Sequence, residues 1–280
     1  MTTTPSLPDP AATRELTELA VEIAREVATL VRASRERGVD LAGVKSTETD
    51  VVTQADLAAE RRLRELLAEH RPHDAILGEE GGTTAGTTGL TWVLDPIDGT
   101  VNYLYGLPVY AVSVAVVAGE PDPASWTQVA GAVVSAADGR TWSAGRGLGA
   151  WHDGERLQVN PPRPLAQSLV ATGFGYDARL RRHQAEVLTG VLDKVRDIRR
   201  AGSCAIDLCS VASGQVDVMY ERGTNPWDFA AGGLVVREAG GVVTGLRHAA
   251  ESTTMMLAGP AQTVAALARI LEDLEADAPL

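Results

Sequence analysis

The sequence predicts a mixed fold of the α/β or α+β class with layered sheets. Apolar residues recur at three- and four-residue steps near the N-terminus, as in an amphipathic helix. Short apolar runs rich in valine follow, and helical and strand patterns alternate through the second half. A chain that mixes buried strands with amphipathic helices buries both by covering sheets with helices.

The N-terminal region predicts a tail and two helices. Residues 1–10 contain three prolines and three threonines, and we expect a disordered tail there. Helical periodicity then runs from 11 to 37, where Gly38 ends it, and a second helix is expected over 55–69.

Strands are expected next, and then strands and helices in turn. The predicted strands share short apolar runs bounded by Gly, Pro or charge; they cover 74–80, 91–95, 109–119, 128–136, 168–173, 216–221, 241–245 and 254–259. The later predicted helices cover 177–195, 203–213, 228–240 and 261–277. The proline-rich stretch 159–167 predicts a boundary between an N-terminal half, 11–160, and a C-terminal half, 161–280.

Composition excludes several classes of partner. The 280 residues carry a formal net charge of −12, which argues against binding to nucleic acid or to an anionic membrane surface. Cys204 and Cys209 form no metal-binding or disulfide pattern and predict reduced thiols. No apolar run approaches the length of a membrane span and no export signal is visible, so we expect a cytoplasmic protein.

Acidic residues follow apolar runs at three places. Glu79 and Glu80 lie in ILGEEGG, Asp95 and Asp98 lie in WVLDPIDGT, and Asp228 lies in NPWDFAAGG. Each segment alone is explained by a solvated loop or by a helix cap. Their joint occurrence instead suggests one site rich in carboxylates.

The DPIDGT segment has the chemistry of a cation site. The proline between the aspartates stiffens a predicted turn, and the Ile97 carbonyl can face the same side as Asp95 and Asp98. Gly99 allows close approach of a ligand, and Thr100 opens a short helix with free N–H groups. The three acidic segments contain no His or Cys, which favours a hard cation such as Mg²⁺ over zinc.

These motifs resemble those of the inositol monophosphatase family of Mg²⁺-dependent, lithium-sensitive phosphatases, in its bacterial inositol-1-monophosphatase type. GEEGG, DPIDGTVNY and NPWDFAAGG occur in the family's order and spacing, and KSTETDVVTQAD and MYERGTNPWD resemble neighbouring family segments. The resemblance covers roughly residues 11–275. It implies a layered α-β-α-β-α sandwich, like that of fructose-1,6-bisphosphatase, with a site between two halves and usually a homodimer.

The resemblance also implies a set of metal ligands. The first metal would be held by Glu79, Asp95 and the Ile97 carbonyl, and the second by Asp95, Asp98 and Asp228. Two or three Mg²⁺ ions are therefore expected in each site. The N-terminal half would carry most of these ligands, and the C-terminal half would carry Asp228 and the substrate contacts.

Roles for the remaining residues follow from the same resemblance. Glu79 and Thr100 would orient the attacking water, and Asp56 would accept a hydrogen bond from the Thr100 hydroxyl. With Asp98 these form the expected catalytic set. The expected phosphate and substrate contacts are the amides of Gly99 and Thr100, the Glu221 carboxylate, and Cys204, which stands where the family generally has a smaller residue. Lys45 and Asp50 match a mobile loop near a weaker third metal.

Electrostatics agree with a metal-dependent reaction. Four carboxylates in one cleft would repel a phosphate monoester, and divalent cations would cancel that charge and activate water. No nucleophile with a partnering base is visible, so no covalent phosphoenzyme is expected.

The predicted function is hydrolysis of myo-inositol monophosphate or of a related sugar or polyol phosphate. Alternatives are fructose-1,6-bisphosphatase, 3′-phosphoadenosine phosphatase, histidinol-phosphate phosphatase and NADP phosphatase. A different class of alternative is a protein-binding module with residual activity. Retention of buried acids at a cost in stability argues against that last hypothesis.

Overall fold

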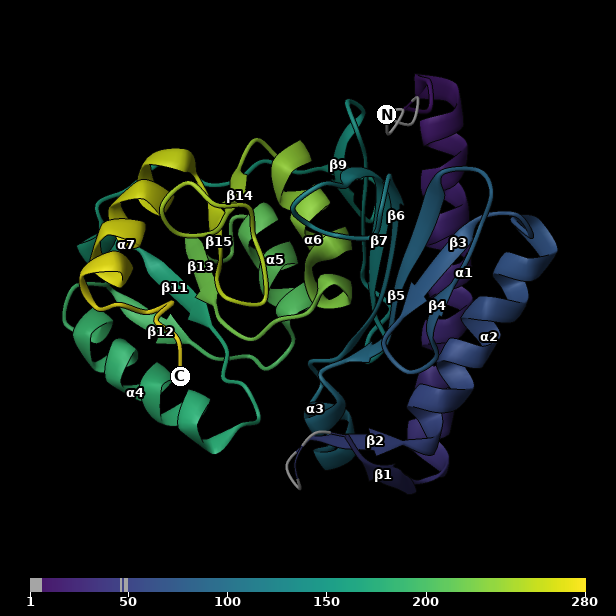
Figure 1. Cartoon of the computed structure of the whole chain (residues 1–280), viewed down its shortest axis with the longest axis horizontal. Coiled ribbons are helices and arrows are strands. Elements are labelled where there is room, and N and C mark those ends of the chain that lie inside the picture. Colours follow the sequence, from purple (N-terminus) through teal and green to yellow (C-terminus); the bar gives the residue numbers. More distant parts are fainter. Residues whose placement is uncertain (1–6, 46, 48–49) are drawn as a thin grey trace.

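The computed structural model contains two main β-sheets and a small third one, with helices between and outside them (Figure 1). It describes residues 7–45, 47 and 50–280. The predicted tail therefore lies mostly outside the described residues.

The larger sheet has eight strands in the order β10-β9-β8-β7-β6-β5-β3-β4. Neighbouring strands are antiparallel except β3 and β5, which are parallel. In chain order the strands are β3 (Ala75–Gly78), β4 (Gly82–Thr84), β5 (Leu90–Asp98), β6 (Ala111–Ala118), β7 (Thr127–Ser135), β8 (Thr141–Gly145), β9 (Gly149–His152) and β10 (Glu155–Arg156).

The smaller main sheet has five strands in the order β12-β11-β13-β15-β14. Strand β11 is parallel to both neighbours, while β15 is antiparallel to β13 and β14. The strands are β11 (Leu169–Thr172), β12 (Asp197–Arg199), β13 (Val218–Glu221), β14 (Val242–Thr244) and β15 (Met256–Gly259). The third sheet is the hairpin β1 (Leu41–Val44) and β2 (Val51–Thr53), beside the short helix α3 (Thr100–Tyr105).

Helices and sheets alternate in five layers, as expected from the resemblance (Figure 1). The first layer is α1 (Pro10–Arg37) and α2 (Gln54–His70), which pack on the eight-stranded sheet. The central layer is α5 (Cys204–Ala212) and α6 (Pro226–Glu238), which contact both sheets. The last is α4 (Ala178–Leu192) and α7 (Ala261–Asp273), beyond the five-stranded sheet.

Helix α1 shows how the local sequence sets an element. The Asp9 carboxylate caps it by accepting from the Ala12 amide at 2.9 Å, and Pro10 occupies the first turn, so the helix begins one residue earlier than the periodicity predicted. Gly38 ends it with a φ of 119°. The apolar stripe of α1 is buried against β6 and β7.

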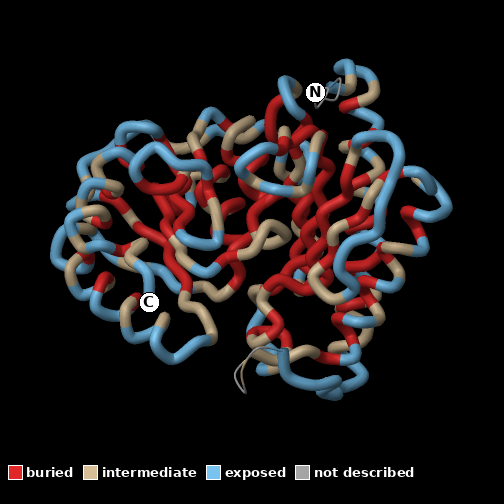
Figure 2. The backbone as a smooth tube through the Cα atoms, in the orientation of Figure 1, coloured by how far each residue is buried: buried red, intermediate tan, exposed pale blue. Residues whose placement is uncertain are grey.

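Strands β6 and β7 are buried on both faces because α1 covers one face and α6 the other. Figure 2 shows this buried core in red, with exposed residues along the outer helices. Small residues allow α6 to approach closely: a Cβ added to Gly131 would lie 3.0 Å from the Ala231 Cα. These small residues pack α6 closely against β7 and α5.

The main predicted helices and strands are all present, but several short elements were not predicted. They are β1, β2, β4, β8, β9, β10, β12 and the 3₁₀ turn Leu165–Gln167, which have five residues or fewer and, in most cases, partly exposed side chains. Among the described residues, no helix combines the length and apolar character needed to cross a membrane.

Candidate active site

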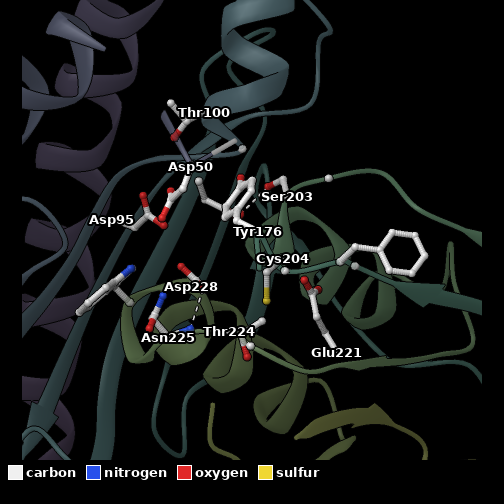
Figure 3. A pocket seen from close by; sticks show the side chains of 18 of the residues that line it. Asp50, Asp95, Thr100, Tyr176, Ser203, Cys204, Glu221, Thr224, Asn225 and Asp228 are labelled. Atoms are coloured by element: carbon white, nitrogen blue, oxygen red, sulfur yellow. Dashed lines mark hydrogen bonds between the residues drawn. The ribbon is translucent and has the colours of Figure 1, made fainter. Parts of the chain in front are cut away.

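A cavity of about 410 Å³ lies between the two main sheets, where several elements begin or end. Its walls come from the ends of β3, β5, β11 and β13 and from the starts of α3, α5 and α6. Figure 3 shows this pocket, with side chains from both halves of the chain facing it. Every residue of the predicted metal and substrate set lines it, except Asp56, which lies behind Thr100.

The DPID segment forms an irregularity within β5 and does not form the expected turn after it. Asp95 pairs with Ser113 and Asp98 pairs with Ala111, so β5 carries one more residue than β6 between these pairs. Such a bulge bends a strand and redirects its side chains. The Asp95 Oδ1 also accepts from the Ile97 amide at 3.0 Å, which fixes the local backbone.

Three of the predicted ligands converge. Asp95, Asp98 and Asp228 each offer one carboxylate oxygen, and these oxygens lie within 4.8 Å of one another. Asp228 belongs to the first turn of α6, where its Oδ2 accepts from the Asn225 amide at 2.7 Å (Figure 3). This capping box fixes the carboxylate at the cavity.

Asp98 is held by the opposite half of the chain. Its Oδ2 accepts from the Ser203 hydroxyl at 2.5 Å and from the Ala205 amide at 2.7 Å. Ser203 is also the N-cap of α5, with its hydroxyl accepting from the Ile206 amide. The N-terminus of α5 therefore orients Asp98, a link that the sequence analysis missed.

Glu79 lies at the edge of the same cavity, beside Lys45. The Lys45 Nζ is 2.7 Å from the Glu79 Oε1 and 2.5 Å from the Glu80 Oε1. Lys45 and Asp50 both line the cavity, as expected for the matched loop, while residues 46, 48 and 49 lie outside the described residues.

Burial and mutual repulsion raise the pKa values of these acids. Burial raises the pKa of Glu79 to about 7 and that of Asp98 to about 6. Burial, followed by the charges of Glu79, Asp98 and Asp228, raises the pKa of Asp95 well above its ordinary value. The pKa of Asp228 is raised in the same way. The cluster thus has excess negative charge that a bound cation would stabilise.

The expected contact between Thr100 and Asp56 is present. The Thr100 Oγ1 lies 3.2 Å from the Asp56 Oδ1 and 3.1 Å from the Ile97 carbonyl oxygen. The other Asp56 oxygen accepts from the Thr53 amide at 2.8 Å and from the Thr53 hydroxyl. Gly99 has a φ of 95°, and an added Cβ would lie 2.8 Å from the Val109 carbonyl oxygen, so glycine is needed there.

The far end of the cavity is lined by Glu221 and Cys204 (Figure 3). Glu221 packs so closely on Gly173 that a Cβ added there would lie 1.9 Å from the Glu221 Oε1. Cys204 and Cys209 are free and buried, and burial raises the pKa of both thiols well above the usual range. Cys204 thus contributes a neutral, apolar wall.

Sequence analysis also missed Asp207 and Arg200, which line the cavity near Glu221. The serine of the SCAID segment was recognisable as a helix cap, and Asp207 lies four residues after it. No sequence pattern showed that this helix end faces the acids of the other half.

Comparisons with known proteins agree with this geometry. The profile of the inositol monophosphatase family matches residues 12–276. The inositol-1-monophosphatase SuhB of Mycobacterium tuberculosis (strain ATCC 25618 / H37Rv) is 46% identical over an alignment of 243 residues, and the match covers 80% of this chain and 82% of that protein. The Nus factor SuhB of Escherichia coli (strain K12) is 36% identical over 265 residues, covering 93% and 97%.

A solved structure of Mycobacterium tuberculosis SuhB superposes on this fold with a TM-score of 0.80. It is 40% identical in sequence, and the match covers 95% of this chain and 99% of that one. The layered architecture and the motif-bearing cavity are thus accompanied by similarity along nearly the whole chain. The chain belongs to the inositol monophosphatase family.

Proposed function

We propose that the protein is a Mg²⁺-dependent phosphomonoesterase that hydrolyses myo-inositol monophosphate to myo-inositol and phosphate. The observation that carries this proposal is the convergence of Asp95, Asp98 and Asp228 beside Glu79 and Thr100. The Glu221 carboxylate at the far end of the same cavity supports a hydroxyl-rich leaving group.

The donor set fits a hard divalent cation. Its side chains offer only oxygen atoms, and burial together with their mutual charge raises their pKa values, so positive charge is favoured among them. We assign Glu79, Asp95 and the Ile97 carbonyl to one Mg²⁺, and Asp95, Asp98 and Asp228 to another. Bound Mg²⁺ would neutralise the phosphate, lower the pKa of the attacking water and stabilise the leaving alkoxide.

Thr100 and Glu79 position the water in this proposal. The Asp56 carboxylate, itself held by Thr53, accepts from the Thr100 hydroxyl. The hydroxyl group is thus held in one direction, and its oxygen can accept a hydrogen bond from the water. Glu79 is the nearby carboxylate that accepts a proton from the water. The Gly99 and Thr100 amides at the start of α3 bind phosphate oxygens.

The leaving group would extend from the phosphate toward Glu221. Because Gly173 carries no side chain, the Glu221 carboxylate can lie against the end of β11, where it can accept from ring hydroxyls. Myo-inositol offers hydroxyls on every ring carbon, which suits a wall with carboxylates.

Two alternatives follow from the family and its relatives. A related phosphatase could use the same metal cage for another phosphate ester, with substrate choice set by the cavity wall. The likeness to the Nus factor SuhB of Escherichia coli supports a protein-binding role as the second alternative. We favour catalysis because the buried acids would destabilise a module that only binds proteins. A homodimer and a cytoplasmic location stay predictions.

The test is phosphate release by metal-stripped protein from inositol 1-phosphate, fructose 1,6-bisphosphate, 3′-phosphoadenosine 5′-phosphate, histidinol phosphate and NADP. We expect inositol 1-phosphate to be the best substrate, no release before Mg²⁺ is added, and inhibition of the Mg²⁺-loaded protein by Li⁺. Full activity in excess chelator, or recovery with Zn²⁺ alone, would contradict the Mg²⁺ mechanism. Preference for another ester would support the related-phosphatase alternative.

A further inference from the structure

We propose that Asp207 is a second specificity-determining residue, which hydrogen-bonds a hydroxyl of the leaving group beside the one bound by Glu221. This inference rests on the proposed function and deepens it. It predicts that loss of Asp207 weakens hydrolysis of esters that carry free hydroxyls more than hydrolysis of esters that carry none.

Asp207 is buried and faces the cavity. It lies in the first turn of α5, its side chain lines the cavity wall, and the residue is only 3% exposed. Within the described part of the chain, its carboxyl group forms no hydrogen bond and no ion pair, although its backbone amide donates to the Ser203 carbonyl at 3.0 Å. Because Asp207 lines the cavity, a ligand there can give its carboxyl group the hydrogen-bond partner that the protein does not provide.

Asp207 lies in the same electrostatic environment as Glu221. After burial, the charge of Asp207 is the largest cause of the raised pKa of Glu221, and Arg200 opposes the shift of both acids. The Arg200 guanidinium is held over the Phe174 ring at 6.0 Å from its centroid. The two carboxyl groups thus line one end of the cavity, near the Arg200 guanidinium.

The chemistry of Asp207 favours a neutral ligand group over a second phosphate. Burial and the charge of Asp98 raise its pKa to about 8, with Arg200 lowering it. The carboxyl group can accept a hydrogen bond from an alcohol whether or not it carries a proton. A second phosphate would instead face the carboxyl groups of Asp207 and Glu221.

The test compares inositol 1-phosphate with cyclohexyl phosphate, which has the same ring size and ester class but no free hydroxyl. We expect Asp207→Ala to lower kcat/KM for inositol 1-phosphate about 10-fold, the effect of one lost hydrogen bond. For cyclohexyl phosphate, the same substitution should lower kcat/KM by less than about threefold. Asp207→Asn, which keeps a donor and an acceptor, should recover most of the loss.

A second readout separates substrate contact from a structural role. Inhibition by myo-inositol alone should weaken by about the same factor in Asp207→Ala and recover in Asp207→Asn. Asp138→Asn, on the exposed turn after β7, is the control and should change kcat/KM for neither ester. Equal losses for both esters, or unchanged myo-inositol inhibition, would overturn the proposal and assign Asp207 to packing of α5.

The wild-type protein distinguishes failure of this inference from failure of the proposed function. If it cleaves another polyol phosphate but not inositol 1-phosphate, the proposed function fails. The effect of Asp207→Ala on kcat/KM for that ester, compared with its effect on kcat/KM for cyclohexyl phosphate, then decides the role of Asp207 by the same criteria. If it cleaves no ester that carries free hydroxyls, both are overturned.

Discussion

At the scale of single residues, three acids of the site are each held by a residue that also caps a helix. Asn225 caps α6 and fixes Asp228, while Ser203 caps α5 and fixes Asp98. Thr53 caps α2 and fixes Asp56. Helix capping thus gives the carboxylates defined positions although their charges repel one another.

Charge removal at the second proposed metal site provides a first prediction. Asp98→Asn and Asp228→Asn keep side-chain shape but each delete one negative charge, so each should lower activity by at least roughly 100-fold at fixed Mg²⁺. The metal-free proteins should melt no lower than the wild type, because an acid whose charged form is disfavoured by burial is replaced by a neutral amide.

The control for this prediction is Asp138→Asn. Asp138 pairs with Arg140 on an exposed turn outside the cavity, so its loss should leave turnover unchanged. Turnover across a Mg²⁺ titration and thermal unfolding without metal are the measurements. Similar turnover in all three variants at saturating Mg²⁺ would contradict the ligand assignment.

At the scale of elements, the close contact of α5 and α6 sets the positions of two acids. Helix α6 carries Asp228, and the start of α5 orients Asp98. A Cβ added to Gly232 of α6 would lie 2.8 Å from the Leu208 Cβ of α5. The distance between the helices therefore depends on glycine at this position.

The second prediction concerns Gly232→Ala. Alanine favours a helix by up to about 1 kcal/mol, but forcing α5 and α6 apart should cost about 1–3 kcal/mol and weaken Mg²⁺ binding. Gly233→Ala is a matched control, because its Cβ would meet the flexible ends of Gln128 and Arg237 at 3.2 and 3.4 Å. Urea unfolding and Mg²⁺ titration of both variants test this. Equal effects would show that the interhelical contact does not set the site.

At the scale of the whole molecule, the protein is acidic, and acidic residues from both of its halves line one buried cavity. The net charge of −12 and the raised pKa values of Glu79, Asp95, Asp98 and Asp228 both favour cation binding. Stability should therefore depend jointly on pH and Mg²⁺.

The third prediction gives the sign of that dependence. A carboxyl group whose pKa is raised on folding contributes stability below its unfolded pKa, and this contribution is lost as pH rises through the folded pKa. Those folded values are about 7 for Glu79 and about 6 for Asp98. Metal-free protein should thus lose stability from about pH 4.5 to about pH 7 through these groups.

Bound Mg²⁺ should replace the protons that these acids hold at low pH. We expect Mg²⁺ to raise the Tm more at pH 7.5 than at pH 5, because protonated acids bind the cation poorly. Thermal unfolding in Mg²⁺ and in chelator at both pH values tests this, with Asp98→Asn showing a smaller difference. An equal Mg²⁺ effect at both pH values would contradict the account.

The sequence by itself determined the local features of this protein. Apolar periodicity indicated the helices, and valine-rich runs indicated β5, β6 and β7, because burial in these elements follows the chain. The family segments indicated Asp95, Asp98, Asp228 and Glu79 as candidate metal ligands, because these acids lie within short motifs beside glycine and proline. Such information is contained in neighbouring residues.

Only the tertiary structure decided which distant residues meet. The hydrogen bond from Ser203 to Asp98 joins positions 105 apart, and it forms because α5 packs between the two sheets. The DPID segment became a bulge because β6 continues beside it, which local turn chemistry cannot reveal. Asp207 entered the cavity for a similar reason: helix packing, and not its neighbours in sequence, sets the direction of the first turn of α5.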